Sequence, residues 1–131
     1  MSHRTTKQNQ EIREIKRKQI LDTALNLFSD SGFHATSISK IAKEAGISKG
    51  LMYNYFESKE ALLFAIVDEI STEIMDMMNP DHDDEITTQE MEDFFTLMFD
   101  SLNEKREHWK LYYQITMQKD VLEYLTEQSK S

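Results

Sequence analysis

Cysteine is absent from the 131 residues of this chain, which excludes disulfide bridges, thiolate metal sites and cysteine nucleophiles. Proline occurs once and glycine three times, so few positions interrupt regular structure. No apolar run approaches membrane-spanning length, and the N-terminal segment MSHRTTKQNQ lacks the apolar core of a signal peptide. Together these absences predict a cytoplasmic protein with no membrane partner.

Apolar residues recur every three or four positions along most of the chain, which predicts an all-α fold. Residues 1–10 are polar and are expected to form a flexible tail before a first helix that starts near Glu11. Two short helices should follow, then a long one from a cap at Ser58 to about Met78. The acidic stretch 79–84 contains the single proline and ends that helix. Thr87 and Glu90 then have the spacing of a capping box, and two or three further helices complete the chain.

The net charge of −9 is distributed unevenly along the chain. Residues 1–67 contain ten Lys/Arg and seven Asp/Glu, a balance of +3, whereas residues 68–131 contain five and seventeen, a balance of −12. Screening limits electrostatic forces at physiological salt to about 8–10 Å, so a local basic face matters more than the total charge. A partner with negative charge is therefore expected at the N-terminal half.

The stretch 36–59 has the pattern of two short helices joined by a turn at Gly46, where a left-handed backbone suits glycine. Thr36 or Ser37, then Ser48 and Ser58, are candidate helix caps, and helix N-termini favour phosphate. Hydroxyl and amine donors that suit phosphate oxygens follow on the same stretch, at Tyr53, Tyr55 and Lys59.

The second short helix should turn Met52 and Phe56 inward and leave Lys49 and Gly50 exposed. A lysine there can donate to guanine O6 and N7, and a glycine lets the backbone approach the groove floor. Each feature alone has a simpler structural interpretation, because cap hydroxyls usually only cap and surface lysines are usually just solvated. Their conjunction favours a helix-turn-helix that binds DNA.

The segment from Ile20 to Leu63, ILDTALNLFSDSGFHATSISKIAKEAGISKGLMYNYFESKEALL, resembles the DNA-binding domain of the tetracycline-repressor (TetR) family. The resemblance implies an all-helical dimer that binds palindromic operators, usually a repressor released by a small-molecule effector. By position, the phosphate contacts would be Thr36, Ser37, Ser48, Tyr53, Tyr55 and Lys59. The base contacts would be Ser39, Lys49, Gly50 and Tyr53.

Three positions depart from the family pattern. Tyr55 stands where many members have histidine, Leu51 replaces a small polar residue, and Asn54 stands where an aromatic residue is common. An apolar Leu51 would contact a base through its methyl groups, for example a thymine methyl. The operator sequence is therefore not carried over from the family.

The domain organisation predicted is a helix-turn-helix domain at 11–57 and a helical regulatory domain at 58–131. A three-helix DNA-binding domain would thus be joined by the long fourth helix to a partial domain for ligand binding and dimerisation. Members of the family are usually longer, with the dimer-forming helices at positions that would follow Ser131. The chain is accordingly expected to be truncated or unusually short, with a homodimer forming in the full-length protein.

In the second half, aromatic and methionine side chains at helical spacing fit either plain core or an effector cavity. The cavity residues would be Phe95, Met98, Phe99, Trp109, Tyr112 and Tyr113. The cluster of Asp81, His82, Asp83 and Asp84 is more typical of a solvated acidic loop than of a metal site, so neither a metal nor another cofactor is predicted.

No nucleophile–base arrangement or phosphate-cradling loop is present in the sequence, so an enzyme is not predicted. The favoured function is a ligand-responsive transcriptional repressor that binds a double-stranded DNA operator. The alternative is a helical protein-interaction module that retains the scaffold and uses its acidic, methionine-rich half to bind a partner.

Overall fold

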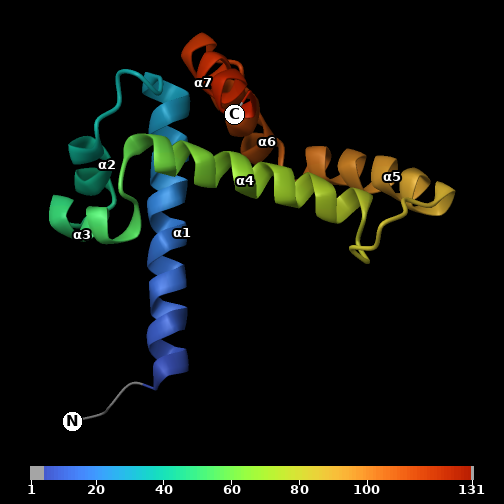
Figure 1. Cartoon of the computed structure of the whole chain (residues 1–131), viewed down its shortest axis with the longest axis horizontal. Coiled ribbons are helices and arrows are strands. Elements are labelled where there is room, and N and C mark those ends of the chain that lie inside the picture. The colour runs from blue at the N-terminus through green and yellow to red at the C-terminus, as the bar shows by residue number, and fades with distance from the viewer. Residues whose placement is uncertain (1–4, 131) are drawn as a thin grey trace.

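The computed structural model describes residues 5–130, and this part of the chain folds into seven helices (Figure 1). The helices are α1 (Thr6–Ser31), α2 (Ile38–Glu44), α3 (Lys49–Tyr55), α4 (Lys59–Met78), α5 (Thr88–Glu104), α6 (Arg106–Thr116) and α7 (Lys119–Ser129). The predicted all-α fold class is confirmed. No described helix combines the length and apolarity needed to cross a membrane.

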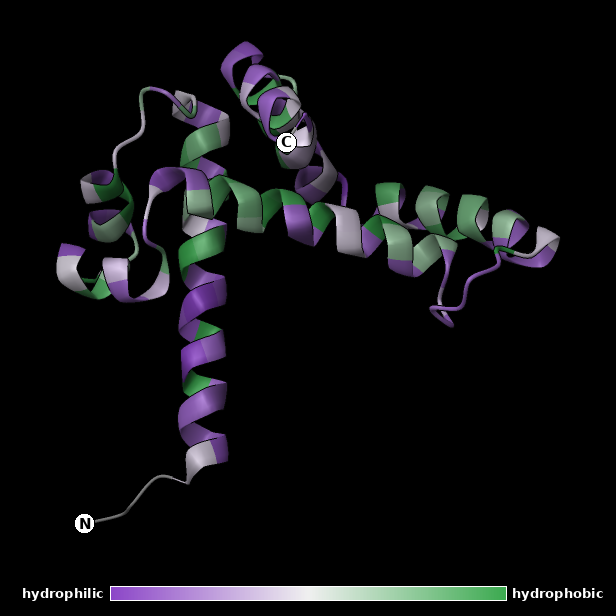
Figure 2. Ribbon diagram, viewed as in Figure 1, coloured by the Kyte–Doolittle hydropathy of each residue, from purple (hydrophilic) through white to green (hydrophobic). Residues whose placement is uncertain are grey.

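The start of α1 lies five residues before the expected position at Glu11. Thr5 Oγ1 accepts a hydrogen bond from Gln8 N at 3.1 Å, and Gln8 Oε1 accepts one from Thr5 N at 2.8 Å. This reciprocal capping box starts the helix, so the prediction of a tail through residue 10 is wrong from Thr6 onward. Residues 1–4 lie outside the described part. The N-terminal half of α1 is mainly hydrophilic and extends past the other helices (Figures 1 and 2).

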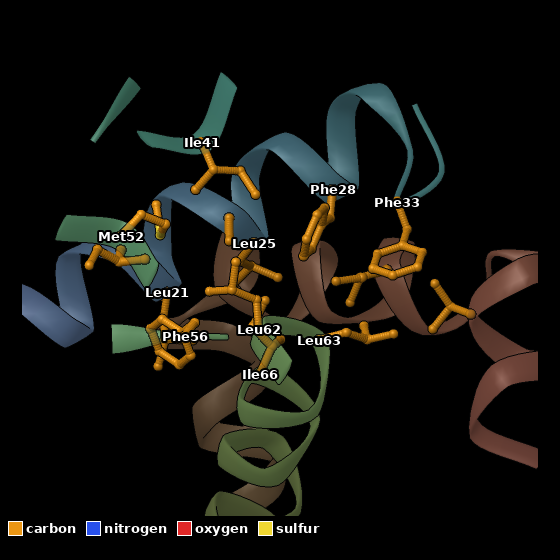
Figure 3. Packing of buried hydrophobic residues seen from close by; sticks show 14 of the residues in the cluster. Leu21, Leu25, Phe28, Phe33, Ile41, Met52, Phe56, Leu62, Leu63 and Ile66 are labelled. Atoms are coloured by element: carbon orange, nitrogen blue, oxygen red, sulfur yellow. The ribbon is translucent and has the colours of Figure 1, made fainter. Parts of the chain in front are cut away.

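The hydrophobic core forms around the C-terminal half of α1 (Figure 3). Phe28 and Phe33 meet there edge to face, with ring centroids 5.0 Å apart. Helices α2, α3, α4, α6 and α7 contribute between one and three buried side chains each, and α5 contributes none. The core comprises Ile20, Leu21, Ala24, Leu25, Phe28, Phe33, Ile41, Ala42, Met52, Phe56, Leu62, Leu63, Ile66, Tyr112, Ile115 and Val121. Burial of apolar area around one central helix thus determines where α2, α3 and α4 lie.

The turn between α2 and α3 has the predicted glycine geometry. Gly46 has a φ of +71°, a left-handed conformation that glycine adopts without steric cost. Its N–H donates to Lys43 O at 3.1 Å, and Ile47 N donates to Ala42 O at 3.0 Å, which closes the C-terminus of α2. Met52 and Phe56 are buried, as predicted. The sharp turn therefore sets α3 against the core and leaves its opposite side in solvent.

Helix α5 runs back along α4 after the 79–87 loop (Figure 1). The expected end of α4 at Met78 and the capping box of Thr87 and Glu90 are both confirmed. Met91, Phe95 and Leu102 recur at helical spacing along α5, yet these side chains are 39%, 64% and 44% exposed. Because α5 packs only against α4 and α6, one narrow side is covered and the rest of its wide apolar stripe faces solvent.

The second half of the chain is joined to α1 by polar contacts as well as by core packing. Gln118 Nε2 donates to Phe28 O at 2.6 Å, and Gln118 Oε1 accepts from Phe33 N at 2.8 Å. Ser29 Oγ donates to Leu111 O at 3.1 Å. Gln118 thus gives Phe28 O a second donor, in addition to Gly32 N, and pairs the Phe33 N–H just after the end of α1. This side chain links the end of α6 to the helix-turn-helix region.

Candidate nucleic-acid interface

Three serine caps begin the helices of the predicted DNA-binding stretch. Ser37 Oγ accepts from Lys40 N at 3.1 Å, Ser48 Oγ from Leu51 N at 3.0 Å, and Ser58 Oγ from Ala61 N at 3.0 Å. Of the two candidates for the first cap, the structure therefore uses Ser37. Ser37 and Ser48 are exposed. Each hydroxyl is positioned at a helix N-terminus, where the partial positive charge of the helix favours an anion.

A hollow on one face brings together most of the side chains predicted to contact DNA. It has a volume of about 390 Å³ and lies between the start of α2 and the solvent-facing side of α3. Ser37, Ser39 and Lys49 are exposed there, and Tyr53 is 47% exposed. The residues that line the hollow are His34, Ala35, Thr36, Ser37, Ile38, Ser39, Lys49, Tyr53 and Lys59. Ser48, Gly50 and Tyr55 lie outside it. The face offers hydroxyl, phenol and ammonium donors to one ligand surface.

Thr36 is a core residue, and the prediction that its hydroxyl contacts phosphate is contradicted by its burial. Its side chain is only 1% exposed. The hydroxyl Oγ1 donates to Gly32 O at 2.7 Å and lies 3.4 Å from Leu27 O. Both carbonyls lie near the C-terminal end of α1. Thr36 therefore fastens the loop that follows α1, since its hydrogen bonds satisfy carbonyls at a helix C-terminus.

Lys59 also has structural partners that the sequence does not reveal. Its Nζ donates to Phe33 O at 2.7 Å and to His34 O at 3.3 Å. The same ammonium lies 4.4 Å from the centre of the Phe33 ring, a cation–π contact. The side chain thus ties the start of α4 to the loop between α1 and α2. Lys59 would therefore contact DNA with an ammonium group that is already hydrogen-bonded to two backbone carbonyls of the protein.

Replacing Lys59 with methionine is expected to lower the free energy of unfolding by about 1–3 kcal/mol, because two carbonyls lose a charged donor. Urea denaturation followed by circular dichroism measures this change. The matched substitution Lys49→Met removes an exposed lysine from α3 and should alter stability by less than about 0.5 kcal/mol. Equal stability of the Lys59 variant and the native chain would contradict the anchoring role.

Two arginines of α1 form a further part of this face, which the sequence-based assignment missed. Arg13 Nη2 donates to Asn54 O at 2.9 Å, and its guanidinium carbon lies 4.4 Å from the centre of the Tyr55 ring. Arg17 lies similarly, 5.0 Å from the centre of the Phe56 ring. Both guanidinium groups therefore lie beside the C-terminal end of α3. The sequence signal for them is the basic run from Arg13 to Lys18, which becomes informative once α1 begins at Thr6.

Gly50 occupies the first turn of α3 without any requirement from the fold. A Cβ atom built there would meet no heavy atom within 4 Å, and its φ is not left-handed. Glycine within a helix lowers stability by up to about 1 kcal/mol relative to alanine. The open space in front of Gly50 faces solvent, so the missing side chain matters only to something that approaches from outside.

The segment that carries these caps, the turn and the outward face of α3 matches a known family. Residues 20–66 match the family described as bacterial regulatory proteins, tetR family. The match extends from the buried start of the core in α1 to Ile66 in α4, and it includes every residue that lines the hollow. Over these residues, the chain is similar to the tetR family of bacterial regulatory proteins.

The chain is also similar to individual bacterial regulators. It is 54% identical over 52 residues to YuxN, an uncharacterized HTH-type transcriptional regulator of Bacillus subtilis (strain 168), which covers 40% of this chain and 18% of YuxN. It is 32% identical over 126 residues to the uncharacterized regulator YerO of the same organism, which covers 82% of this chain and 44% of YerO. The chain therefore spans less than half the length of these two curated relatives.

A solved structure shares the fold beyond the matched segment. The crystal structure of a TetR-family transcription regulator from Shewanella sp. PV-4 superposes with a TM-score of 0.64 at 29% sequence identity. The alignment covers 86% of this chain and 61% of that chain. That structure therefore shares the arrangement of α5, α6 and α7 around α1 and α4, in addition to the helix-turn-helix.

The six side chains predicted to line an effector cavity do not gather around one in this chain. Phe95, Phe99 and Tyr113 are 64%, 67% and 66% exposed. Trp109 Nε1 instead donates to Ser101 Oγ at 2.8 Å, which packs α6 on α5. Burial raises the pKa of the Tyr112 phenol, and the nearby carboxylates of Glu73 and Glu69 raise it further. Trp109 and Tyr112 belong to the contacts between helices, and Met98 is partly buried.

Proposed function

We propose that this chain is a DNA-binding transcriptional regulator whose helix α3 enters the major groove. The observation that carries the proposal is the hollow between α2 and α3, where Ser39, Lys49 and Tyr53 meet on one exposed face. A helix held by a buried inner side presents such residues to base edges while neighbouring groups hold the phosphates. The match of residues 20–66 to the tetR family supports this assignment.

The contacts separate into two kinds on physical grounds. Ser37 and Ser48 at helix N-termini, with the Tyr53 phenol, would hold phosphate oxygens and set the register. The guanidinium of Arg13 stacks on the Tyr55 ring and adds positive charge there, so we propose that Arg13 and Tyr55 together contact a phosphate. Lys49 and Ser39 would read base edges, and Gly50 would allow the close approach. Tyr53 lies next to both groups, because it lines the hollow together with Ser39 and Lys49 and also lines a second hollow together with Arg17 and Tyr55.

The proposed partners rest on the similarity of residues 20–66 to the tetR family. We propose a palindromic double-stranded operator bound by a homodimer, since two half-sites one helical turn apart need two copies of α3. Repression relieved by a small-molecule effector is part of the same proposal. A regulator of this kind works in the cytoplasm, where the DNA is, and needs no enzymatic activity.

Replacing Lys49 with alanine is expected to lower affinity for a preferred duplex about tenfold or more and to relax the sequence preference. The physical reason is the loss of a base-edge contact worth about 1–3 kcal/mol. Sites selected from random duplexes by the native chain supply the preferred sequence, and fluorescence anisotropy measures the affinity.

The matched control for this experiment is Lys110→Ala, which removes an exposed lysine from α6 and changes the net charge equally. It should leave the preference unchanged. If both variants bind like the native chain, or if the native chain retains no duplex at low salt, the regulator proposal is wrong. The protein-interaction alternative would then be favoured by the exposed side of α5, where Phe95 and Phe99 face solvent.

A further inference from the structure

Residues with side-chain oxygen atoms are spaced along the loop between α4 and α5 in a pattern that the acidic composition of the loop does not by itself reveal. The twelve residues from Asn79 to Glu90 read NPDHDDEITTQE. Helix–loop–helix calcium sites follow the pattern D-x-[DN]-x-[DN]-G-x₅-E, in which positions 1, 3, 5 and 12 bind through side chains and position 7 through its carbonyl. In this chain, Asn79, Asp81, Asp83 and Glu90 occupy positions 1, 3, 5 and 12. Glu85 occupies position 7. The loop also joins two helices, as the pattern requires.

The carboxylates at positions 3, 5 and 12 converge in the structure. Oxygen atoms of Asp81, Asp83 and Glu90 all lie within 4.8 Å of one another. Asp81 and Asp83 come from the loop, whereas Glu90 reaches back from the first turn of α5. Three like charges at this separation repel one another unless a cation lies between them.

Two oxygens of the loop, at positions 1 and 12, are buried without a hydrogen-bond partner. They are Asn79 Oδ1 and Glu90 Oε2, the two buried side-chain atoms of the described residues that lack one. Each residue uses its other polar atom within the loop. Asn79 Nδ2 donates to Asp83 O at 2.7 Å, and Glu90 Oε1 accepts from the Thr87 hydroxyl at 3.1 Å. A buried acceptor without a donor is costly, and a cation bound in the loop would satisfy both atoms.

We propose that the 79–90 loop binds one calcium ion. The ligands are Asn79 Oδ1, one carboxylate oxygen each from Asp81 and Asp83, the Glu85 carbonyl oxygen and both oxygens of Glu90. Six oxygen ligands that include a bidentate carboxylate suit Ca²⁺, whereas Mg²⁺ prefers a strict octahedron that retains several waters. His82 is outside this set, because its Nε2 lies 3.5 Å from Asp76 Oδ1 on α4.

The loop departs from the calcium pattern at two positions, and each has a physical consequence. Asp84 occupies position 6, where glycine normally makes a sharp turn; here the left-handed residue is His82, with a φ of +55°. Asn79 supplies a neutral oxygen at position 1 in place of a carboxylate. Because affinity rises with ligand charge and rigidity, binding is expected at the weak end, with a Kd of about 10⁻⁵–10⁻³ M.

A bound ion would connect two helices directly. Asn79 is the C-cap residue of α4, and Glu90 lies in the first turn of α5. The ion would therefore lock the end of the α4–α5 hairpin that is remote from the DNA-binding face (Figure 1). This site is independent of the proposed function, so either proposal can fail without the other.

Calcium titration of the 131-residue chain by isothermal calorimetry tests the site, with three variants chosen to keep the fold. Glu90→Gln removes the bidentate carboxylate but keeps a residue that completes the capping box. Asp81→Asn changes an exposed side chain. Glu85→Gln is the matched control, because it removes the same charge from a residue that binds only through its backbone.

The native chain and Glu85→Gln should bind one Ca²⁺ with affinities within about twofold, and the other two variants at least about tenfold more weakly. Calcium should also raise the Tm of the native chain and of the control, but not that of Glu90→Gln. Absence of binding at millimolar Ca²⁺ would overturn the proposal. Equal weakening in Glu85→Gln, or equal affinity for Mg²⁺, would overturn it too, since general attraction to acidic groups would then explain the binding.

Discussion

Replacing Gly50 with leucine is expected to leave the fold intact while lowering affinity for a preferred duplex about 100-fold. A side chain at this position meets nothing in the protein, so it projects into the space where α3 would approach DNA. Holding the helix away from the groove removes at least two contacts worth about 1–3 kcal/mol each, which corresponds to roughly two powers of ten in Kd. Fluorescence anisotropy with a duplex selected by the native chain measures this loss.

The companion variant Gly50→Ala separates the effect on binding from any effect on stability. Alanine should raise the free energy of unfolding by up to about 1 kcal/mol, because it is the better helix former. Its affinity for DNA should lie between those of the native chain and the leucine variant. Native affinity in Gly50→Leu would show that the first turn of α3 does not approach the groove, and the assignment of this face would fail.

Phe28→Ala is expected to have the largest effect on stability, lowering the free energy of unfolding by about 3–5 kcal/mol. The ring is fully buried and meets Phe33 edge to face. It lies in the core that positions α2, α3 and α4, so its loss leaves a cavity at the point where the DNA-binding helices are held. Small domains are stable by only about 5–15 kcal/mol, so the variant should unfold at much lower urea concentration.

The control for this prediction is the same truncation on α5, Phe99→Ala. Phe99 is 67% exposed, so its removal should change stability by less than about 0.5 kcal/mol. Urea denaturation of both variants, followed by circular dichroism, gives the comparison. A cost for Phe99→Ala close to that for Phe28→Ala would mean that the outer side of α5 is covered in solution.

The contrast between these phenylalanines explains why helical spacing alone did not show which apolar side chains are buried. Phe28 and Phe99 both belong to apolar stripes with helical spacing, and the periodicity is equally clear in each. Periodicity identifies which side of a helix is apolar. It does not identify which neighbours cover that side. Helix α1 packs against α2, α4 and α6 and carries five of the buried core residues, whereas α5 packs mainly against α4 and α6 and carries none of them.

The DNA-binding face shows a similar division. The cap at Ser48, the turn at Gly46 and the inward side chains of Met52 and Phe56 follow from local chemistry, and the structure has them as predicted. The structural role of Lys59 does not, because its partners lie 25 and 26 residues away. The site residues themselves remain predictions that the DNA-binding experiments will test.

The sequence by itself determined the helical fold, the capped boundaries of α2, α3 and α4, and the residues that a short helix turns outward. These features depend on hydrogen bonds and periodicities within a few residues, so they can be recognised in one segment alone. Only the tertiary structure decided that Thr36 is buried, that Arg13 reaches Asn54, and that Gln118 joins α1. Such contacts link residues up to 90 positions apart or depend on how a loop folds over a helix end, and no local pattern encodes them.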